Sequence, residues 1–239
     1  RSTNDDYQFF LNAGPLVNLD KYYDSSNEFW QQLKEHSSYD EFWQKRGLLR
    51  HLKNIKPAVM IVGGWFDAED LYGPLNTYST IEKSSKNYNT IVMGPWSHGD
   101  WARNSEKQII GNINFGDSIS GFYQKNIEAN FFRHFLKNNG KGENKLPEAY
   151  VFDTGRKEWK TYDAWPPKNT ETQQFYLQPQ QKLTKNAGAV SFEEFISDPK
   201  KPVPHSEDIK QQGLTPRKYM TDDQRFAARR PDVLVFETD

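Results

Sequence analysis

Residues 57–139 alternate between short apolar runs and longer amphipathic segments. The runs at 57–62 and 90–93 are continuously apolar and each is stopped by glycine, which is typical of buried parallel strands. Residues 71–84 and 119–138 carry apolar side chains at helical spacing along one stripe. This strand–helix–strand–helix order predicts an α/β sandwich.

The segment before this region has a different pattern. Residues 1–50 are aromatic and polar with helical spacing and no strand signal, so they predict a small helical unit. Asn27 or Ser26 is expected to cap its second helix and Ser38 its third, because short polar side chains accept the first free backbone N–H groups.

The segment after it carries short alternating runs between turn residues, which predict an all-β domain of the sandwich or jelly-roll type. These runs lie at 150–152, 159–162, 174–177, 188–191 and 233–236. The polar, proline-containing stretch 197–230 is too long for a plain loop in a compact domain. The expected domains are therefore 1–50 (helical), 51–145 (α/β) and 146–239 (β).

Each of the two predicted strands of the α/β region is followed by a motif that contains an ionisable side chain suited to catalysis. The first is followed by GGWFD, ending at Asp67, and the second by GPWSHG, which contains His98. Since the carboxyl ends of parallel strands meet at the edge where α/β sheets bind ligands, both residues are site candidates. Acid followed by histidine is also the order of the last two members of an α/β-hydrolase triad, although no G-x-S-x-G nucleophile motif is present.

These motifs resemble the CocE/NonD hydrolase family, the peptidase S15 group. Further stretches fit the same family in the right order: DTG at 153–155 with Trp159, AWPP at 164–167, SDPKKPVP at 197–204 and RPDVLVF at 230–236. The family includes cocaine esterases and X-Pro dipeptidyl-peptidases, and the branch of α-amino acid ester hydrolases and glutaryl-7-aminocephalosporanic acid acylases is the most similar.

The resemblance implies an α/β fold: a helical cap segment, the C-terminal half of an α/β-hydrolase domain, and part of a jelly roll. It implies a serine hydrolase of esters or amides that forms an acyl-enzyme, with Asp67 as the acid and His98 as the base. The nucleophilic serine and the oxyanion hole would lie upstream, so this chain alone is expected to be inactive. Expected substrates are α-amino acid esters, β-lactam acyl groups and short peptides.

Alternatives stay open at several residues. Glu69 and Asp70 compete with Asp67 as the acid, although their simplest role is at the first turn of the next helix. Trp65, Phe66 and Trp96 flank the two catalytic candidates; the resemblance implies walls of an acyl pocket, and packing beneath the site is an equal reading.

Asp40 and Glu41 lie in the cap-like segment, and the family's ester hydrolases hold a substrate ammonium with clustered carboxylates. The alternative for this pair is a solvated helix face. The remaining histidines show no metal-ligand spacing and no phosphate loop follows a strand, so no metal or other cofactor is expected.

The composition excludes several classes of protein function. With a net charge of −1, the chain has no overall positive potential that would attract nucleic acid. No apolar run reaches the roughly 18 residues that a membrane-spanning helix needs. With no Cys, disulfides and thiol nucleophiles are excluded.

The expected partners are a small ester, amide or peptide substrate and the rest of the same polypeptide, with a homo-oligomer left open. The resemblance to exported bacterial enzymes suggests a periplasmic or secreted protein. The rival functions are an X-Pro dipeptidyl-peptidase and a non-catalytic binding fragment.

Overall fold

The computed structural model describes residues 5–23, 26–103, 107–139, 141, 146–209 and 217–238. The chain forms two compact units. We call Tyr39–Thr170 with Arg217–Thr221 the sheet unit, and Arg1–Ser38, Glu171–Pro216 and Asp222–Asp239 the second unit. No helix in the described ranges is long and apolar enough to cross a lipid bilayer.

The sheet unit is built on four strands in the order β1-β2-β5-β6. Their bounds are β1 Val59–Gly64, β2 Asn89–Gly94, β5 Ala149–Asp153 and β6 Glu158–Tyr162. The first three strands are parallel, and β6 runs antiparallel to β5. Every residue of β2 is buried, as expected for a strand with neighbours on both edges and helices on both faces.

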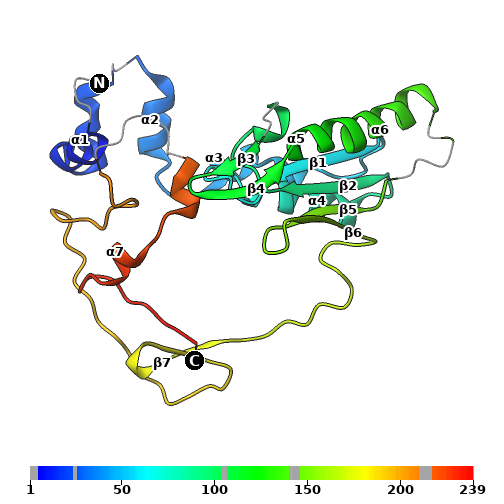
Figure 1. The fold of residues 1–239 in the computed structure, drawn as a ribbon. Coiled ribbons are helices and arrows are strands. Elements are labelled where there is room, and N and C mark those ends of the chain that lie inside the picture. The colour runs from blue at the N-terminus through cyan, green and yellow to red at the C-terminus, as the bar shows by residue number, and fades with distance from the viewer. Residues whose placement is uncertain are drawn as a thin grey trace. The chain divides into compact units, whose positions relative to one another are not determined.

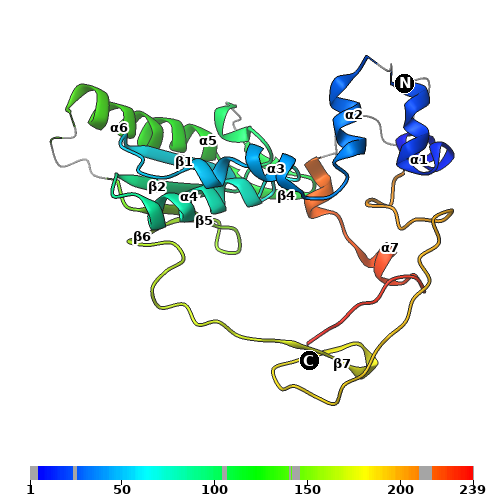
Figure 2. The same ribbon diagram turned by 180° about the vertical axis from the view of Figure 1, so that it is seen from behind.

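Helices cover both faces of this sheet (Figures 1 and 2). One face packs against α4 (Tyr72–Ser84), where Ile91 and Met93 of β2 meet Tyr78. The other face packs against residues 119–137, where Val92 meets Ile127. The alternation of Ile91, Val92 and Met93 between two cores follows from the period of two along a strand.

Residues 119–137 are helical throughout, with α-helical turns alternating with π-helical ones. The successive parts are α5 Ile119–Phe122, η4 Tyr123–Glu128, α6 Ala129–Phe132 and η5 Arg133–Lys137. The other elements of the sheet unit are α3 Glu41–Arg46, η2 Leu48–His51, η3 Asp100–Ala102, β3 Lys107–Ile110, β4 Ile113–Asp117 and η7 Arg217–Thr221.

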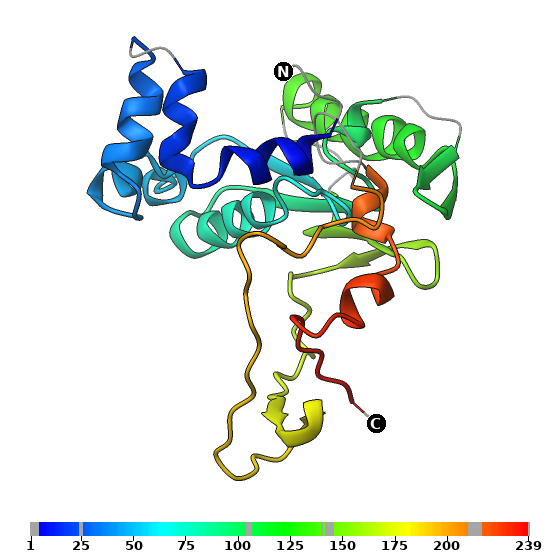
Figure 3. The ribbon, with the colours of Figure 1, turned by 90° about the vertical axis from the view of Figure 1, so that its left-hand side faces the viewer.

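The second unit contains short helices and one small strand pair. Its elements are α1 Asp6–Ala13, η1 Leu16–Tyr22, α2 Glu28–Glu35, β7 Tyr176–Gln178, η6 Pro179–Gln181, β8 Lys182–Thr184 and α7 Arg225–Ala228. Residues 185–209 form no helix or strand, and Figure 3 shows this segment (gold) as an extended chain.

The sequence predictions for the central region are confirmed: both parallel strands and both long helices lie where the pattern placed them. The helical character of the first 50 residues is also confirmed over the described part, and Asn27 caps α2 by accepting the Trp30 N–H at 3.0 Å. The prediction of Ser38 as the next cap is wrong. Asp40 takes that place and accepts the Phe42 N–H at 3.0 Å, because it directly precedes the first helical residue.

The structure differs from the expected β region in two ways. The runs around 150–152 and 159–162 form β5 and β6, which extend the sheet of β1 and β2. Residues 188–191 and 233–236 are not strands, and near the end of the chain only an isolated bridge joins Lys182 to Glu237 within the described residues. The structure is thus a mixed α/β protein, and the jelly roll, the cap and the domain limits stay predictions.

Candidate active site

The ends of β1 and β2 approach each other very closely. Gly64 pairs with Gly94, and the ladder continues beyond the strands because the Trp65 and Phe66 N–H groups donate to the carbonyls of Gly94 and Trp96 at 2.9 and 3.0 Å. A Cβ atom on Gly64 would lie 2.2 Å from the Trp96 carbonyl oxygen. Only glycine fits this approach, so the glycine of the first motif lets the two turns lie side by side.

Asp67 is buried and fully engaged on this edge. It is 4% exposed. Its Oδ1 accepts the backbone N–H groups of Glu69 at 2.8 Å and Asp70 at 2.9 Å. Its Oδ2 lies 2.9 Å from Nδ1 of His98. An aspartate at this position both closes its own turn and orients the imidazole of the neighbouring turn.

His98 is the exposed member of the pair, with 55% of its side chain accessible. Because Nδ1 donates to the Asp67 carboxylate, the neutral ring has its acceptor nitrogen at Nε2. This is the tautomer that a general base needs to take a proton from a hydroxyl group.

The electrostatics of the pair favour its charged form. Burial alone would raise the pKa of Asp67, but the hydrogen bonds from Asp70, Glu69 and His98 outweigh it and lower the pKa below its ordinary value. The hydrogen bond and charge of Asp67 raise the pKa of His98 above its ordinary value, with further contributions from Glu69 and Asp70. His98 is therefore half neutral only at a pH above 6.5, its ordinary pKa.

The two competing carboxylates have different surroundings. Asp70 Oδ1 accepts the Gly73 N–H at 2.5 Å, which is a bond to the first turn of α4. Glu69 is exposed and contributes to His98 through its charge. The hydrogen bond to His98 is thus made by Asp67, and Glu69 and Asp70 add negative charge beside it.

The aromatic candidates are distributed over both faces of the sheet. Trp96 is fully buried, and its Nε1 donates to Ser120 Oγ at 3.0 Å. Phe66 packs on Phe115 with ring centroids 4.9 Å apart. Trp65 donates from Nε1 to the Phe152 carbonyl at 3.2 Å. Trp96 thus supports the site from within the core.

Trp65 and Phe66 also line a recess of about 490 Å³ at the carboxyl ends of β1 and β5. Phe152 and Trp165 belong to the same lining, and Trp165 lies 6.2 Å from Trp65 between ring centroids. These two of the three aromatic candidates therefore have surfaces that a bound molecule can reach.

Asp40 and Glu41 belong to the start of α3. Asp40 caps this helix, as described above, and Glu41 pairs with Lys45 one turn later, with Nζ and Oε1 at 2.9 Å. Both Glu41 and Lys45 are mostly exposed. The role of Asp40 and Glu41 in binding a substrate ammonium group stays a prediction.

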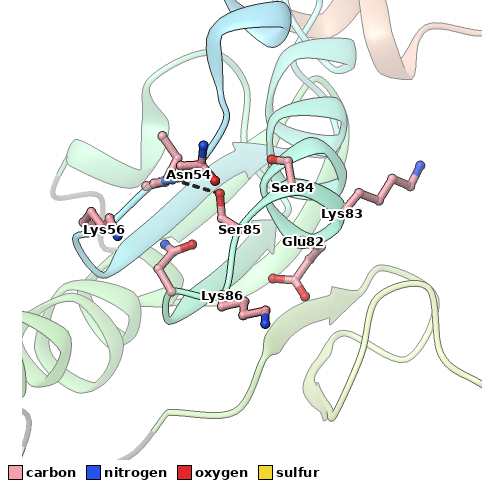
Figure 4. Close-up of a pocket in the computed structure, with 9 residues that line it drawn as sticks. Asn54, Lys56, Glu82, Lys83, Ser84, Ser85 and Lys86 are labelled. Atoms are coloured by element: carbon pink, nitrogen blue, oxygen red, sulfur yellow. Dashed lines mark hydrogen bonds between the residues drawn. The ribbon is translucent and has the colours of Figure 1, made fainter.

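A second hollow, of about 660 Å³, lies at the opposite, amino-terminal edge of the sheet (Figure 4). It is lined by residues 54–56 and 82–87 and is bridged by the Ile55 N–H, which donates to Ser85 Oγ at 2.9 Å. The lysines labelled in Figure 4 point away from one another. Because it lies at the opposite edge of the sheet, this hollow is separate from the Asp67–His98 pair.

The described residues contain no group of three or more His, Cys, Asp or Glu side chains arranged to hold a metal ion. The chemistry that the site itself offers is proton transfer by a histidine oriented by a carboxylate.

Two adjacent parallel strands are followed by a buried aspartate and by a histidine hydrogen-bonded to it, which is the acid–base arrangement that α/β-hydrolases also have. The sequence comparisons show which known proteins this chain is similar to. The model described as "X-Pro dipeptidyl-peptidase (S15 family)" matches residues 4–100. The curated cocaine esterase of Rhodococcus sp. (strain MB1 Bresler) is 26% identical over 188 residues, which is 72% of this chain and 31% of that enzyme. The chain is thus similar to members of the peptidase S15 (CocE/NonD) family.

A solved structure supports the fold. The aminopeptidase from the marine sediment archaeon Thaumarchaeota archaeon matches all of this chain with a TM-score of 0.88 and 31% identity. The match covers 40% of that aminopeptidase, so this chain spans less than half the length of the relatives it resembles.

Sequence reasoning missed the residues that hold the His98 turn. Asp100 and Ser120 are both buried and hydrogen-bonded around this turn. The only local signal was the S-x-x-D spacing of Ser97 and Asp100, and Ser120 carries no signal because its contacts are distant in sequence.

Proposed function

We propose that the protein containing this chain hydrolyses esters or amides through an acyl-enzyme, with Asp67 as the acid and His98 as the base. The observation that carries this proposal is the 2.9 Å contact between Asp67 Oδ2 and His98 Nδ1 at the carboxyl edge of the sheet. The nucleophilic serine would be supplied by a part of the protein outside this chain.

In this mechanism His98 Nε2 takes the proton of the serine hydroxyl while its oxygen attacks the carbonyl carbon. The tetrahedral intermediate then breaks the bond to the leaving group, which receives the proton from His98, and an acyl-serine remains. Water attacks the acyl-serine in the same way, with His98 again taking and returning a proton. Asp67 stabilises the imidazolium each time it forms.

The proposed substrates carry a free α-amino group: amino acid esters, β-lactam acyl groups with such an amine, or short peptides. Glu69 and Asp70 support this choice, because their negative charge lies close enough to raise the pKa of His98 and would also attract an ammonium group. The solved structure that matches the whole chain is that of an aminopeptidase, which also supports this choice. Trp65 and Phe66 are the proposed hydrophobic walls for the acyl side chain, with Asp40 and Glu41 as additional candidates for the ammonium.

The second candidate is an X-Pro dipeptidyl-peptidase, which the description of the matching family model favours. A chromogenic Gly-Pro amide and an amino acid ester separate the two candidates, since a dipeptidyl-peptidase would prefer the former by its kcat/KM.

The test of the shared mechanism is fluorophosphonate labelling of the longest natural polypeptide that carries this sequence. We expect a label on one serine, and loss of labelling when His98 is changed to Gln. Absence of label on the intact, folded protein would reject the serine-hydrolase proposal and favour a binding role.

A further inference from the structure

The turn that carries His98 is closed by hydrogen bonds that do not involve the imidazole. Ser97 donates twice to Oδ2 of Asp100, from its backbone N–H at 3.1 Å and from its hydroxyl at 2.6 Å. The Asp100 N–H donates back to the Ser97 carbonyl at 3.1 Å. Between them Gly99 has φ +75°, a left-handed conformation that glycine adopts without strain. The backbone on both sides of His98 is therefore fixed by Asp100.

Asp100 is a buried carboxylate with its hydrogen-bonding capacity used. It is 3% exposed, and its second oxygen, Oδ1, accepts from Nη1 of Arg103 at 2.9 Å. A buried charge without partners would be costly, and here the Ser97 donors and the Arg103 guanidinium supply them. Asparagine, with one acceptor oxygen, cannot accept from Ser97 and Arg103 on two separate oxygens.

Ser120, at the start of the helical segment 119–137, ties this turn to the core. Its side chain is fully buried. Its Oγ accepts from Trp96 Nε1 at 3.0 Å and lies 3.1 Å from the Asp100 carbonyl, to which it can donate. Gln108 Oε1, at 3.4 Å, is the more distant acceptor. One hydroxyl thus bridges the residues two positions before and two positions after His98.

The imidazole itself has far less support than its backbone. Its side chain is more than half exposed, and its ring contacts are the bond to Asp67 and an edge contact to Trp101 with centroids 6.3 Å apart. The place of Nδ1 relative to Asp67 therefore depends on how firmly the turn is held.

We propose that Asp100 and Ser120 are positioning residues for the reaction: they hold the His98 turn so that Nδ1 meets Asp67 and Nε2 faces the nucleophile. The proposal deepens the proposed function and rests on it for its catalytic part. Neither residue touches a reacting atom. A displacement of about 1 Å at a catalytic group can cost about 100-fold in rate, so loosening this turn lowers kcat.

The experiment compares Asp100→Asn and Ser120→Ala in the longest natural polypeptide that carries this sequence. Ser85→Ala is the matched control, because Ser85 Oγ also accepts a hydrogen bond within the sheet unit, from the Ile55 N–H, but lies at the opposite edge of the sheet. Three quantities are measured: kcat and KM for an amino acid ester, the pKa of His98 by NMR of ¹³C-labelled histidine, and the melting temperature.

We expect kcat to fall by about 100-fold in Asp100→Asn and by about 10-fold in Ser120→Ala, with KM within twofold. The pKa of His98 should fall toward 6.5 in both variants, because that pKa is raised mainly by the hydrogen bond to Asp67. Ser85→Ala should leave kcat and the pKa of His98 unchanged.

Two results would overturn the proposal. One is a variant with a lower melting temperature but an unchanged His98 pKa and kcat, since that would make the network merely structural. The other is an unchanged protein in all three measurements. If Asp100→Asn does not fold, Ser97→Ala removes only the 2.6 Å bond and is read in the same way. If the unmodified protein neither hydrolyses esters nor takes a fluorophosphonate label, the proposed function fails, and the His98 pKa still decides whether the turn is held as inferred.

Discussion

The carboxyl edge of the sheet and the segment 171–209 both contain aromatic residues, but these are buried in the first region and exposed in the second. Trp96 at the sheet edge is 0% exposed, and the neighbouring Asp67 is 4% exposed. In the other segment Phe192 is 81% exposed and Phe195 54% exposed. The first region has strands and helices within one unit to cover its side chains, whereas the second has one small strand pair.

The difference shows what a positioned site requires. The Asp67–His98 contact joins two turns that are held by the sheet ladder, by close glycine contacts and by the Ser120 bridge. In residues 185–209 few buried contacts restrain the chain, so local opening is expected to be easy there. A side chain that is capable of catalysis can act only where the packing around it fixes its geometry.

The largest expected effect tests the site directly. His98→Gln should lower kcat/KM by roughly 10⁴- to 10⁶-fold, because the base is lost while the fold is kept. Ester hydrolysis measures this effect, and His51→Gln, at an exposed position in the same unit, is the control and should retain activity. If His98→Gln retained its activity, His98 would not be the base, and the sheet edge would no longer differ from the segment 171–209 in carrying a catalytic residue.

Asp67→Asn should follow with a loss of about 10⁴-fold in kcat, because an amide at this position favours the wrong tautomer of the histidine. Steady-state kinetics with the same ester measures the loss, and circular dichroism verifies the fold. A loss below tenfold would point to another carboxylate, such as Asp70, as the acid.

The stability comparison uses one apolar residue from the sheet and one from the segment 171–209. Ile91→Ala, at a fully buried position of β2, should destabilise the protein by about 2–5 kcal/mol. Phe192→Ala should change the unfolding free energy by less than about 0.5 kcal/mol, because the side chain is already exposed. Urea denaturation measures both, and equal effects would contradict the contrast between the regions.

The pH dependence follows from the pair. The acidic limb of activity should have its midpoint above pH 6.5, because the raised pKa of His98 keeps it protonated to a higher pH than usual. For stability, the raised pKa of His98 gives a contribution that is complete below 6.5 and is lost as the pH rises through the folded pKa. The lowered pKa of Asp67 gives a contribution that is present above 3.8 and is lost as the pH falls through its folded pKa.

The kinetic part is measured as the acidic limb of kcat/KM, and the stability part as the urea midpoint between pH 4 and pH 9. Since His98 is more than half exposed, solvent screening keeps the stability part small. An acidic limb below pH 6.5 would contradict the role of Asp67 in raising the pKa of His98.

The smallest effect is expected at the helix surface. Glu41→Gln removes the exposed pair with Lys45 and should change the unfolding free energy by less than about 0.5 kcal/mol, since such pairs are screened by water. Chemical denaturation at low and high salt measures it. A large change in KM for an amino acid ester, with kcat unchanged, would instead support a role of Glu41 in binding the ammonium.

The sequence by itself determined the elements whose signals are local. Apolar runs stopped by glycine located β1 and β2, helical spacing located α4 and the segment 119–137, and the motifs placed Asp67 and His98 at adjoining strand ends. The substrate, a homo-oligomeric state and a periplasmic or secreted location stay predictions.

Only the tertiary structure decided which neighbours these elements have. Alternation of side chains located the strands near residues 150 and 160, but their pairing with β2 depends on contacts far apart in sequence, which strand propensity does not encode. The burial of Trp96 and its bond to Ser120 arise in the same way. The chemistry of the site could be read from a few consecutive residues, whereas its geometry depends on packing between segments that the chain brings together only when it folds.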